Sequence, residues 1–233
     1  DRPIAEQFVQ YMGQAARLDF GVSYQQSRPA MEIVLDRLPA TFELAIVAFL
    51  IAIAVALPAG ILSATYRNTP VDYGAMSSAL LGQSMPNFWL GLMLILIFSL
   101  GLDLLPTSGR LTHGISSRAT TDFYLFEGLF RLDWVLFFDA LKHAILPAVT
   151  AGLYSSARLT RLVRSSMLDV LGEDYIRTAR AKGLAEWKVI NKHGLKNAAI
   201  PLVTMAGIEL GLLLGGTVVT ETVFAWPGIG LLT

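Results

Sequence analysis

Four long segments of this sequence hold almost no charged side chains, and they constrain the fold more than any other feature. Residues 44–66 and 73–102 carry no charge, and residues 134–157 and 198–220 carry three charged residues between them. An α-helix rises 1.5 Å per residue, so about 20 residues cross a hydrocarbon core of roughly 30 Å. Only 15% of the chain is charged, against about a quarter in soluble domains. We therefore predict an all-α, polytopic transmembrane helical bundle with four crossings.

Polar residues and a proline interrupt the second of these segments. Gln83, Ser84, Pro86 and Asn87 lie near the middle of residues 73–102. Proline removes a backbone donor, and amide side chains need partners inside a membrane. One interpretation is a kinked helix whose amides bond to neighbouring helices. The other is a broken helix that lines a path through the membrane, with Gln83 and Asn87 as candidate pore-lining residues. The sequence leaves both open.

The distribution of basic residues indicates how the chain is oriented. Residues 158–196 contain nine lysines and arginines, whereas residues 103–143 contain four. The positive-inside rule makes residues 158–196 cytoplasmic. Four alternating crossings then leave residues 1–37, residues 103–133 and the C-terminus outside.

We expect the chain to have two parts. Residues 1–37 form an extracytoplasmic amphipathic segment that is too short for a packed domain of its own. Residues 38–233 form a transmembrane domain with a cytoplasmic loop at about residues 165–197. The chain begins at Asp1 without an initiator methionine and ends shortly after a turn-like Pro-Gly-Ile-Gly. We therefore expect an internal piece of a longer protein, and no signal peptide is visible.

The cytoplasmic loop has the pattern of two short helices joined at a glycine. Tyr175, Ala179 and Gly183 share one helical face, and a glycine can take the left-handed conformation that ends a helix. Apolar residues of a second helix follow at a spacing of three: Leu184, Trp187 and Ile190. The residues alone leave two interpretations open. Small and apolar side chains face outward to dock on a partner, or the pair is an amphipathic hairpin on the lipid surface.

The order Thr178, Ala179, Arg180, then Gly183, then Ile200 and Pro201 resembles the EAA motif of binding-protein-dependent ABC transporter permeases. That motif has a Glu-Ala-Ala core, a glycine three residues later and a later Ile-x-Leu-Pro. Thr178 and Arg180 depart from it. The string Tyr-Ile-Arg-Thr-Ala-Arg-Ala-Lys-Gly-Leu from residue 175 is similar to the peptide branch of this family. Further strings similar to that branch lie at residues 37–41, 105–109, 221–224 and 226–230.

The resemblance implies the type I ABC importer permease fold and a B-type permease subunit of dipeptide and oligopeptide importers. The family has six crossings, of which this chain would lack the first and the last. The implied partners are cytoplasmic ATP-binding subunits, a second permease subunit and an extracytoplasmic solute-binding protein, assembled with lipid in the bacterial cytoplasmic membrane. Relatives in this branch carry nickel, glutathione or opine-like solutes, so these solutes are alternatives to peptides.

The same resemblance implies that the segment around Gly183 couples the permease to an ATP-binding subunit. Three coupling residues match the family motif: Ala179, Gly183 and Pro201. Three others are inferred from their spacing: Leu184, Trp187 and Ile190. ATP binding and closure of the ATPase dimer would then drive alternating access of the pore.

Glu209 is the charged residue that we single out within a crossing, because a carboxylate in a membrane faces protein or water. It could line the translocation path and meet a substrate amine or a proton. Alternatively, it could be neutral and bonded to another helix. An ion-coupled secondary transporter with Glu209 as its coupling carboxylate is the competing function, and a scaffold without transport fits the intramembrane Gln83, Asn87 and Glu209 poorly.

The sequence offers no support for chemical catalysis or for a bound cofactor. It lacks Gly-x-x-x-x-Gly-Lys-Ser/Thr, His-Glu-x-x-His and Gly-x-Ser-x-Gly, so it has no motif for ATP binding, zinc hydrolysis or a serine nucleophile. It has no cysteine, and its three histidines fall on separate segments, so we expect no metal site. Its zero net charge gives no electrostatic argument for nucleic acid.

Overall fold

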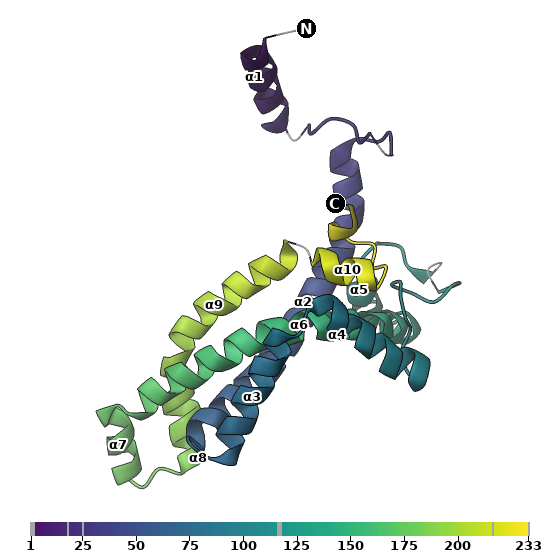
Figure 1. Cartoon of the computed structure of the whole chain (residues 1–233). Coiled ribbons are helices and arrows are strands. Elements are labelled where there is room, and N and C mark those ends of the chain that lie inside the picture. Colours follow the sequence, from purple (N-terminus) through teal and green to yellow (C-terminus); the bar gives the residue numbers. More distant parts are fainter. Residues whose placement is uncertain (1–2, 18, 25, 116–117, 216, 233) are drawn as a thin grey trace.

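The computed structural model describes residues 3–17, 19–24, 26–115, 118–215 and 217–232, and it confirms the all-α class (Figure 1). The helices are α1 (Ile4–Ala15), α2 (Ala30–Thr65), α3 (Pro70–Ser84), α4 (Asn87–Leu94), the π-helix η1 (Ile95–Gly101), α5 (Tyr124–Phe130), α6 (Trp134–Leu171), α7 (Asp174–Ala181), α8 (Glu186–Lys188), the π-helix η3 (Val189–Leu195), α9 (Lys196–Leu214), α10 (Val218–Val223) and the 3-10 helix η4 (Gly230–Leu232). Residues 102–123 connect η1 to α5, and the short segment of residues 224–229 connects α10 to η4.

The two longest helices, α2 and α6, pack along each other and form the centre of the molecule. Buried small residues recur at every fourth or eighth position along both contact faces. They are Ala40, Ala48, Ala52, Ala56 and Gly60 on α2, and Ala140, Ala144, Ala148, Gly152 and Ser156 on α6. A Cβ at Gly152 would lie 2.6 Å from the carbonyl oxygen of Ala48. Small residues therefore let the two backbones approach closely, as they do between membrane helices generally.

Helix α9 packs against this central pair on larger side chains. Its buried Ala198 and Leu202 join a cluster with Ala64 of α2 and with Val163 and Met167 of α6. Through this cluster α9 packs against both α2 and α6.

The second crossing is broken rather than gently kinked. Helices α3 and α4–η1 meet at Met85 and Pro86 with their axes bent by 102°. Met85 takes an extended conformation, which is the conformation that a following proline imposes on the residue before it. Pro86 then leads directly into Asn87, the first residue of α4. Of the two interpretations of residues 73–102, a kinked helix and a broken helix, the structure has the broken helix.

Among the described residues, three helical segments are long and apolar enough to cross a membrane, or four if the bent pair counts as one crossing. They are Ala30–Thr65, Trp134–Leu171 and Glu186–Leu214. The first begins before residue 38, where we expected the transmembrane domain to start. The fourth predicted crossing, residues 198–220, is wrong at its end because α9 stops at Leu214 and α10 is a separate helix.

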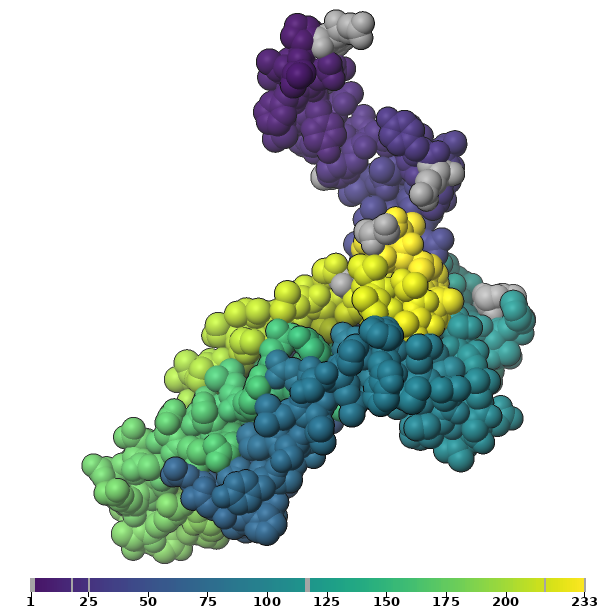
Figure 2. Space-filling view, in the orientation of Figure 1, coloured from purple at the N-terminus to yellow at the C-terminus, as the bar shows by residue number. Residues whose placement is uncertain are grey.

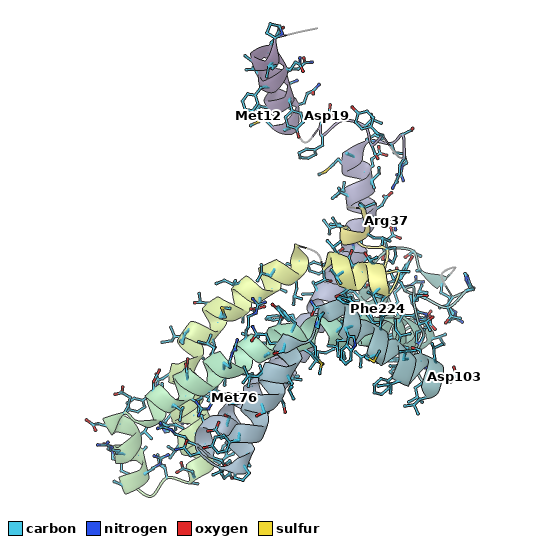
Figure 3. All side chains as sticks on the ribbon, viewed as in Figure 1. Met12, Asp19, Arg37, Met76, Asp103 and Phe224 are labelled. Atoms are coloured by element: carbon cyan, nitrogen blue, oxygen red, sulfur yellow. The ribbon has the colours of Figure 1, made fainter. Side chains whose placement is uncertain are left out.

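The two ends of the bundle differ in character. Figure 1 shows α7 and α8 at one end, which we call the α7 end, and α10 with the C-terminus toward the other, the α10 end. Arg37 and Phe224 lie at the α10 end, whereas Met76 lies on α3 toward the α7 end (Figure 3). Helix α1 projects away from the bundle, and it contributes no buried residue to it (Figure 2).

Candidate functional site

The segment between α6 and α9, which we call the insert (residues 172–195), bends at Gly183. Helix α7 ends at Ala181, and Gly183 has a φ of +75°, which confirms the prediction that a left-handed glycine closes this helix. A Cβ at Gly183 would meet no atom within 4 Å. The backbone conformation, and not the available space, therefore requires glycine at this position.

The second short helix predicted after Gly183 is the start of a much longer one. Three residues of α-helix, Glu186–Lys188, continue as the π-helix η3 and then as α9 up to Leu214. Pro201 lies in α9, outside the insert, and is exposed. The C-terminal part of the insert is thus continuous with a helix long enough to cross a membrane.

Two of the expected outward-facing residues point into the protein. Ala179 is buried with Ile176 and Val189 in a cluster that also contacts Leu171 of α6. Ile190 is half-buried against the cluster shared by α2, α6 and α9. The expectation that Ala179 and Ile190 form an outward apolar face is wrong, because two helices this short need apolar contacts to stay attached to the bundle.

Other apolar side chains of the insert do lie on its surface. Trp187 is 70% exposed, and Tyr175 and Leu184 are also exposed. Of the five insert residues that we predicted for coupling, Gly183, Leu184 and Trp187 are therefore exposed, at the bend or within four residues of it. Large exposed apolar side chains next to one another commonly mark an interaction surface.

An ion pair braces the bend from outside. The guanidinium of Arg180 donates to the carboxylate of Glu186 at 2.6 Å, through Nη2 to Oε1, and at 3.1 Å, through Nε to Oε2. Arg180 is one of the two departures from the family motif noted above, and here it links α7 to α8 across Gly183.

A second ion pair joins α6 to α9 well away from the insert. Arg158 Nη2 donates to Glu209 Oε2 at 2.9 Å, and the Glu209 side chain is fully buried. The guanidinium also lies 5.1 Å from the ring centroid of Tyr154. Glu209 is therefore bonded to another helix, as in one of the two interpretations, but its partner is a cation. Sequence spacing did not indicate Arg158 as this partner, although Arg158 stands directly after the predicted crossing that ends at residue 157.

A cavity of about 380 Å³ adjoins this pair. Its lining comes from α4, α6, α9, α10 and the α9–α10 connection: Asn87, Ala151, Tyr154, Ser155, Arg158, Leu212, Leu213 and residues 217–220. Asn87 thus lines a cavity, and it does so at the break in the second crossing. Gln83 is half-buried on α3 and Glu209 lies behind Arg158, and neither is part of this lining.

A third ion pair fastens α3 to α6. Arg164 donates Nε to Asp72 Oδ1 and Nη2 to Asp72 Oδ2, both at 2.7 Å. The hydroxyl of Ser63 and the backbone N–H of Asn68 also donate to the Asp72 carboxylate. This pair uses both oxygens of its carboxylate and lies away from the cavity, so it acts as a structural fastening.

At the α10 end, the structure brings together the strings at residues 37–41, 105–109 and 221–230. The indole N–H of Trp226 donates to the carbonyl of Ala40 at 2.9 Å, and the Thr41 hydroxyl donates to Glu221 at 3.0 Å. The backbone N–H of Gly109 donates to the carbonyl of Phe224 at 3.0 Å. Segments far apart in the sequence thus form one hydrogen-bonded junction.

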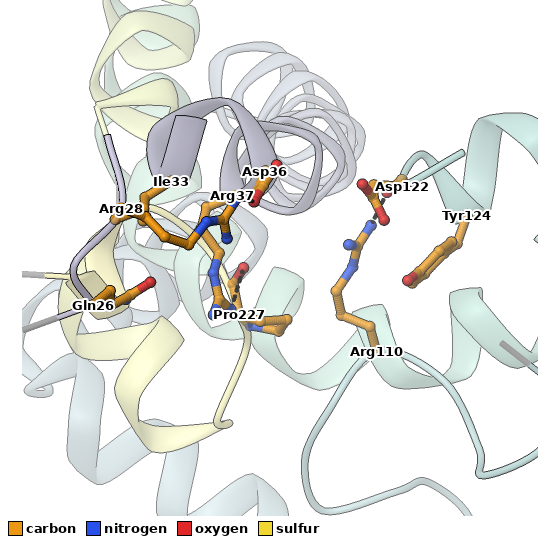
Figure 4. A pocket seen from close by; sticks show the side chains of 9 residues that line it. All are labelled: Gln26, Arg28, Ile33, Asp36, Arg37, Arg110, Asp122, Tyr124 and Pro227. Atoms are coloured by element: carbon orange, nitrogen blue, oxygen red, sulfur yellow. Dashed lines mark hydrogen bonds and ion pairs between the residues drawn. The ribbon is translucent and has the colours of Figure 1, made fainter. Parts of the chain in front are cut away.

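Beside this junction lies a pocket of about 420 Å³, with Arg28, Arg37 and Arg110 among its lining residues (Figure 4). Arg110 is buried, and its Nη2 donates to Glu43 at 2.7 Å and to the carbonyl of Asp122 at 2.7 Å. Its guanidinium lies 4.2 Å from the ring centroid of Tyr124. These contacts hold the loop before α5 against α2.

The chain is similar to known membrane transport proteins over most of its length. It is 43% identical over 233 residues to the dipeptide transport system permease protein DppB of Escherichia coli K12, covering 99% of this chain and 69% of that protein. It is 40% identical over 232 residues to the glutathione transport system permease protein GsiC of another Escherichia coli strain, covering 100% of this chain and 67% of that protein.

A solved structure has a similar fold. It is a chain of the MetNI methionine ABC transporter in an inward-facing conformation, with a TM-score of 0.62 and 18% identity over 87% of this chain and 79% of that chain. The family described as binding-protein-dependent transport system inner membrane component matches residues 56–233. The matched region includes the insert, the Arg158–Glu209 pair and the junction strings of the C-terminal half. This chain therefore belongs to the family of inner-membrane permease components of binding-protein-dependent ABC transport systems.

Proposed function

We propose that this chain is the pore-forming permease subunit of an ATP-driven importer that carries di- and oligopeptides across the cytoplasmic membrane of a bacterium. The observation that carries the proposal is the close identity to a dipeptide permease over nearly the whole chain. The glutathione permease is nearly as similar, and glutathione is itself a small peptide. Nickel is the alternative of different chemistry. Family membership favours ATP-driven transport over an ion-coupled secondary carrier.

The exposed bend of the insert supports coupling to an ATP-binding subunit. Leu184 and Trp187 are exposed on either side of Glu186, whereas Ile176 and Val189 are fully buried against the bundle. A hairpin that only rested on lipid would not need such an anchor. An anchored bend can transmit the movement of a docked partner to α6 through Leu171.

Helix α6 offers a direct route from this bend to the cavity. Leu171 and Arg158 lie on the same helix, and thirteen residues of helix span about 20 Å. Movement of the insert would therefore reach both Arg158 on α6 and Glu209 on α9, at the edge of the cavity. Alternating access follows when two permease subunits and an ATPase dimer move together in this way.

The basic insert supports a cytoplasmic location for the α7 end by the positive-inside rule. The α10 end then faces the extracytoplasmic solute-binding protein, which would deliver solute to the pore. The remaining partners are a second permease subunit beside this one and the surrounding lipid. ATP hydrolysis belongs to the ATP-binding subunits.

Uptake by the complete transporter tests this function. The full-length permease is reconstituted into lipid vesicles with its second permease, ATP-binding subunits and solute-binding protein, and entry of radiolabelled alanyl-alanine is measured with and without ATP. We expect ATP-dependent uptake that excess unlabelled dipeptide abolishes. Inhibition by nickel ions but not by dipeptide would contradict the peptide assignment. A matched complex with an inactivated ATP-binding subunit is the control for ATP dependence.

A further inference from the structure

The Arg158–Glu209 pair is left incomplete in a way that the Arg164–Asp72 pair is not. Only one nitrogen and one oxygen join Arg158 to Glu209, while Arg158 Nε and Glu209 Oε1 are buried and have no hydrogen-bond partner among the residues that the structure describes. Arginine–carboxylate pairs commonly form two parallel hydrogen bonds, as Arg164 and Asp72 do. Buried polar atoms without partners are costly, so the incomplete pair has capacity for a ligand.

The cavity next to the pair has further unused polar groups. Thr220 is 1% exposed and lines the cavity, and its Oγ1 has no hydrogen-bond partner within the described part of the chain. Asn87 and Ser155 line other parts of the wall. Leu212, Leu213, Val218 and Val219 supply apolar surface. A ligand that suits this lining has charged ends, polar amides and variable apolar side chains.

We propose that Arg158 and Glu209 recognise the two charged termini of a short, unblocked peptide. The C-terminal carboxylate of the peptide binds Arg158, whose guanidinium faces the cavity with 29% of the side chain exposed. The guanidinium then moves off Glu209, and the peptide ammonium binds the freed carboxylate. The inference rests on the proposed function and names the chemistry by which its substrate is held.

The electrostatics favour a zwitterion over a singly charged solute. Separating a buried ion pair leaves each charge uncompensated, which is strongly unfavourable in a membrane interior. A zwitterionic peptide replaces both partners at once, so the net charge of the site does not change. Tyr154, on which the guanidinium stacks, keeps Arg158 oriented during the exchange.

The size of the site favours short peptides. The cavity of about 380 Å³ lies at the lower end of the range for small-molecule pockets. An extended residue spans at most about 3.6 Å, so both termini of a dipeptide can reach one separated ion pair. The termini of a long extended peptide cannot.

Direct binding to the membrane complex tests the inference without interference from the solute-binding protein. The purified full-length transporter, without that protein, is titrated with alanyl-alanine, its N-acetyl form and its C-terminal amide, and dissociation constants are measured by NMR. We expect each blocked form to bind about tenfold more weakly or worse, because each loses a hydrogen bond to a charged group. Equal binding of the three peptides, or no binding of alanyl-alanine, would overturn the proposal.

Single variants separate recognition from a structural role. Glu209→Gln is expected to remove most of the discrimination against N-acetyl peptide, and Arg158→Gln most of the discrimination against the amide. A purely structural pair would produce no such crossed pattern. Asp72→Asn is the matched control, because it weakens a similar ion pair away from the cavity, and it should leave the ratios among the three peptides unchanged.

Two further measurements keep the inference open to refutation. If a single variant does not assemble, the double variant Arg158→Met/Glu209→Leu replaces the ion pair with apolar side chains, which folded proteins often tolerate. It should bind all three peptides as weakly as the blocked forms bind the unmodified complex, and unchanged selectivity would refute recognition by the pair. ATP-driven uptake of alanyl-alanine, measured in parallel, separates a failure of this inference from a failure of the proposed function. If alanyl-alanine is taken up but the three peptides bind equally well, only the inference about the ion pair is refuted.

Discussion

Gly183 is the residue at which backbone conformation and the proposed coupling coincide. Its φ of +75° turns the chain from α7 toward α8, and the exposed Leu184 and Trp187 lie just beyond it. Arg180 and Glu186 hold the bend from outside through their ion pair. The orientation of the exposed side chains therefore depends on one residue that a side chain would strain.

We predict that Gly183→Ala weakens coupling more than it weakens the fold. A left-handed conformation costs a residue with a Cβ roughly 1–2 kcal/mol, and this strain falls on an exposed bend outside the buried clusters. Peptide uptake per ATP hydrolysed should fall, while the melting temperature of the complex changes little. Gly74→Ala on α3, where a Cβ would meet nothing within 4 Å, is the control and should leave both quantities unchanged.

Glu127 gives a prediction about pH. Thr121 and Thr120 each donate a hydroxyl and a backbone N–H to its carboxylate at 2.7 to 2.8 Å, and Arg131 pairs with it at 2.6 Å. The Thr121 hydroxyl is the largest of the causes that hold the pKa of Glu127 far below its usual value of 4.5. Below that value the unfolded chain binds the proton and the folded chain does not, so acid destabilises the loop.

Unfolding of the purified protein in detergent should therefore show a loss of stability as the pH falls below about 4.5. Glu127→Gln should lower the free energy of unfolding at neutral pH by about 1–3 kcal/mol, and its melting temperature should fall accordingly. The variant should also lose part of this acid dependence. Glu186→Gln, which affects an exposed ion pair, should change stability far less. Identical pH profiles for Glu127→Gln and the unmodified protein would contradict the assignment.

The residue-scale predictions from sequence succeeded where one residue type decides the outcome. Gly183 was predicted to end a helix because of its conformational freedom, and this is confirmed. Glu209 was recognised as exceptional from its place in an apolar run, but its partner was missed. Arg158 is far away in the sequence, and sequence spacing does not report which helices lie side by side. Ala179 was placed on the wrong side because helical periodicity groups residues by face without saying which face is buried.

At the scale of elements, the contact between α2 and α6 rests on close approach of their backbones. Small residues recur in steps of four along both helices, which matches the period at which a helix repeats a face. This pattern was present in the sequence and would have predicted the central pair. The break at Pro86 could be predicted only as one of two possibilities, because membrane helices also tolerate proline through a kink.

We predict that Gly152→Ala destabilises this central contact. The added methyl would lie 2.6 Å from the carbonyl oxygen of Ala48, so α2 and α6 must separate or shift, at a cost of about 1–3 kcal/mol. The melting temperature of the purified protein should fall. Gly207→Ala on α9, where nothing lies within 4 Å of an added Cβ, is the matched control, and a loss of stability as large as that of Gly152→Ala would argue against close packing as the cause.

At the scale of the whole molecule, α6 connects the functional features. It carries Leu171 at the insert, Arg164 at the fastening to α3, and Arg158 at the cavity. At its other end it packs near α5 and the loop that Arg110 holds. The apolar crossings were readable from hydropathy, whereas this arrangement depends on contacts between distant segments.

The central claim is that the insert receives force from an ATP-binding subunit, and disulfide trapping tests it most directly. These 233 residues hold no cysteine, and Leu184→Cys or Trp187→Cys in an otherwise cysteine-free full-length transporter can be paired with single cysteines near the Q-loop of the ATP-binding subunit. Leu129→Cys on α5, which is also exposed, is the control. We predict crosslinks from positions 184 and 187 whose yield changes with ATP, and none from position 129. With the complete complex present, the absence of any crosslink from the insert would contradict this account and favour a hairpin that rests on lipid.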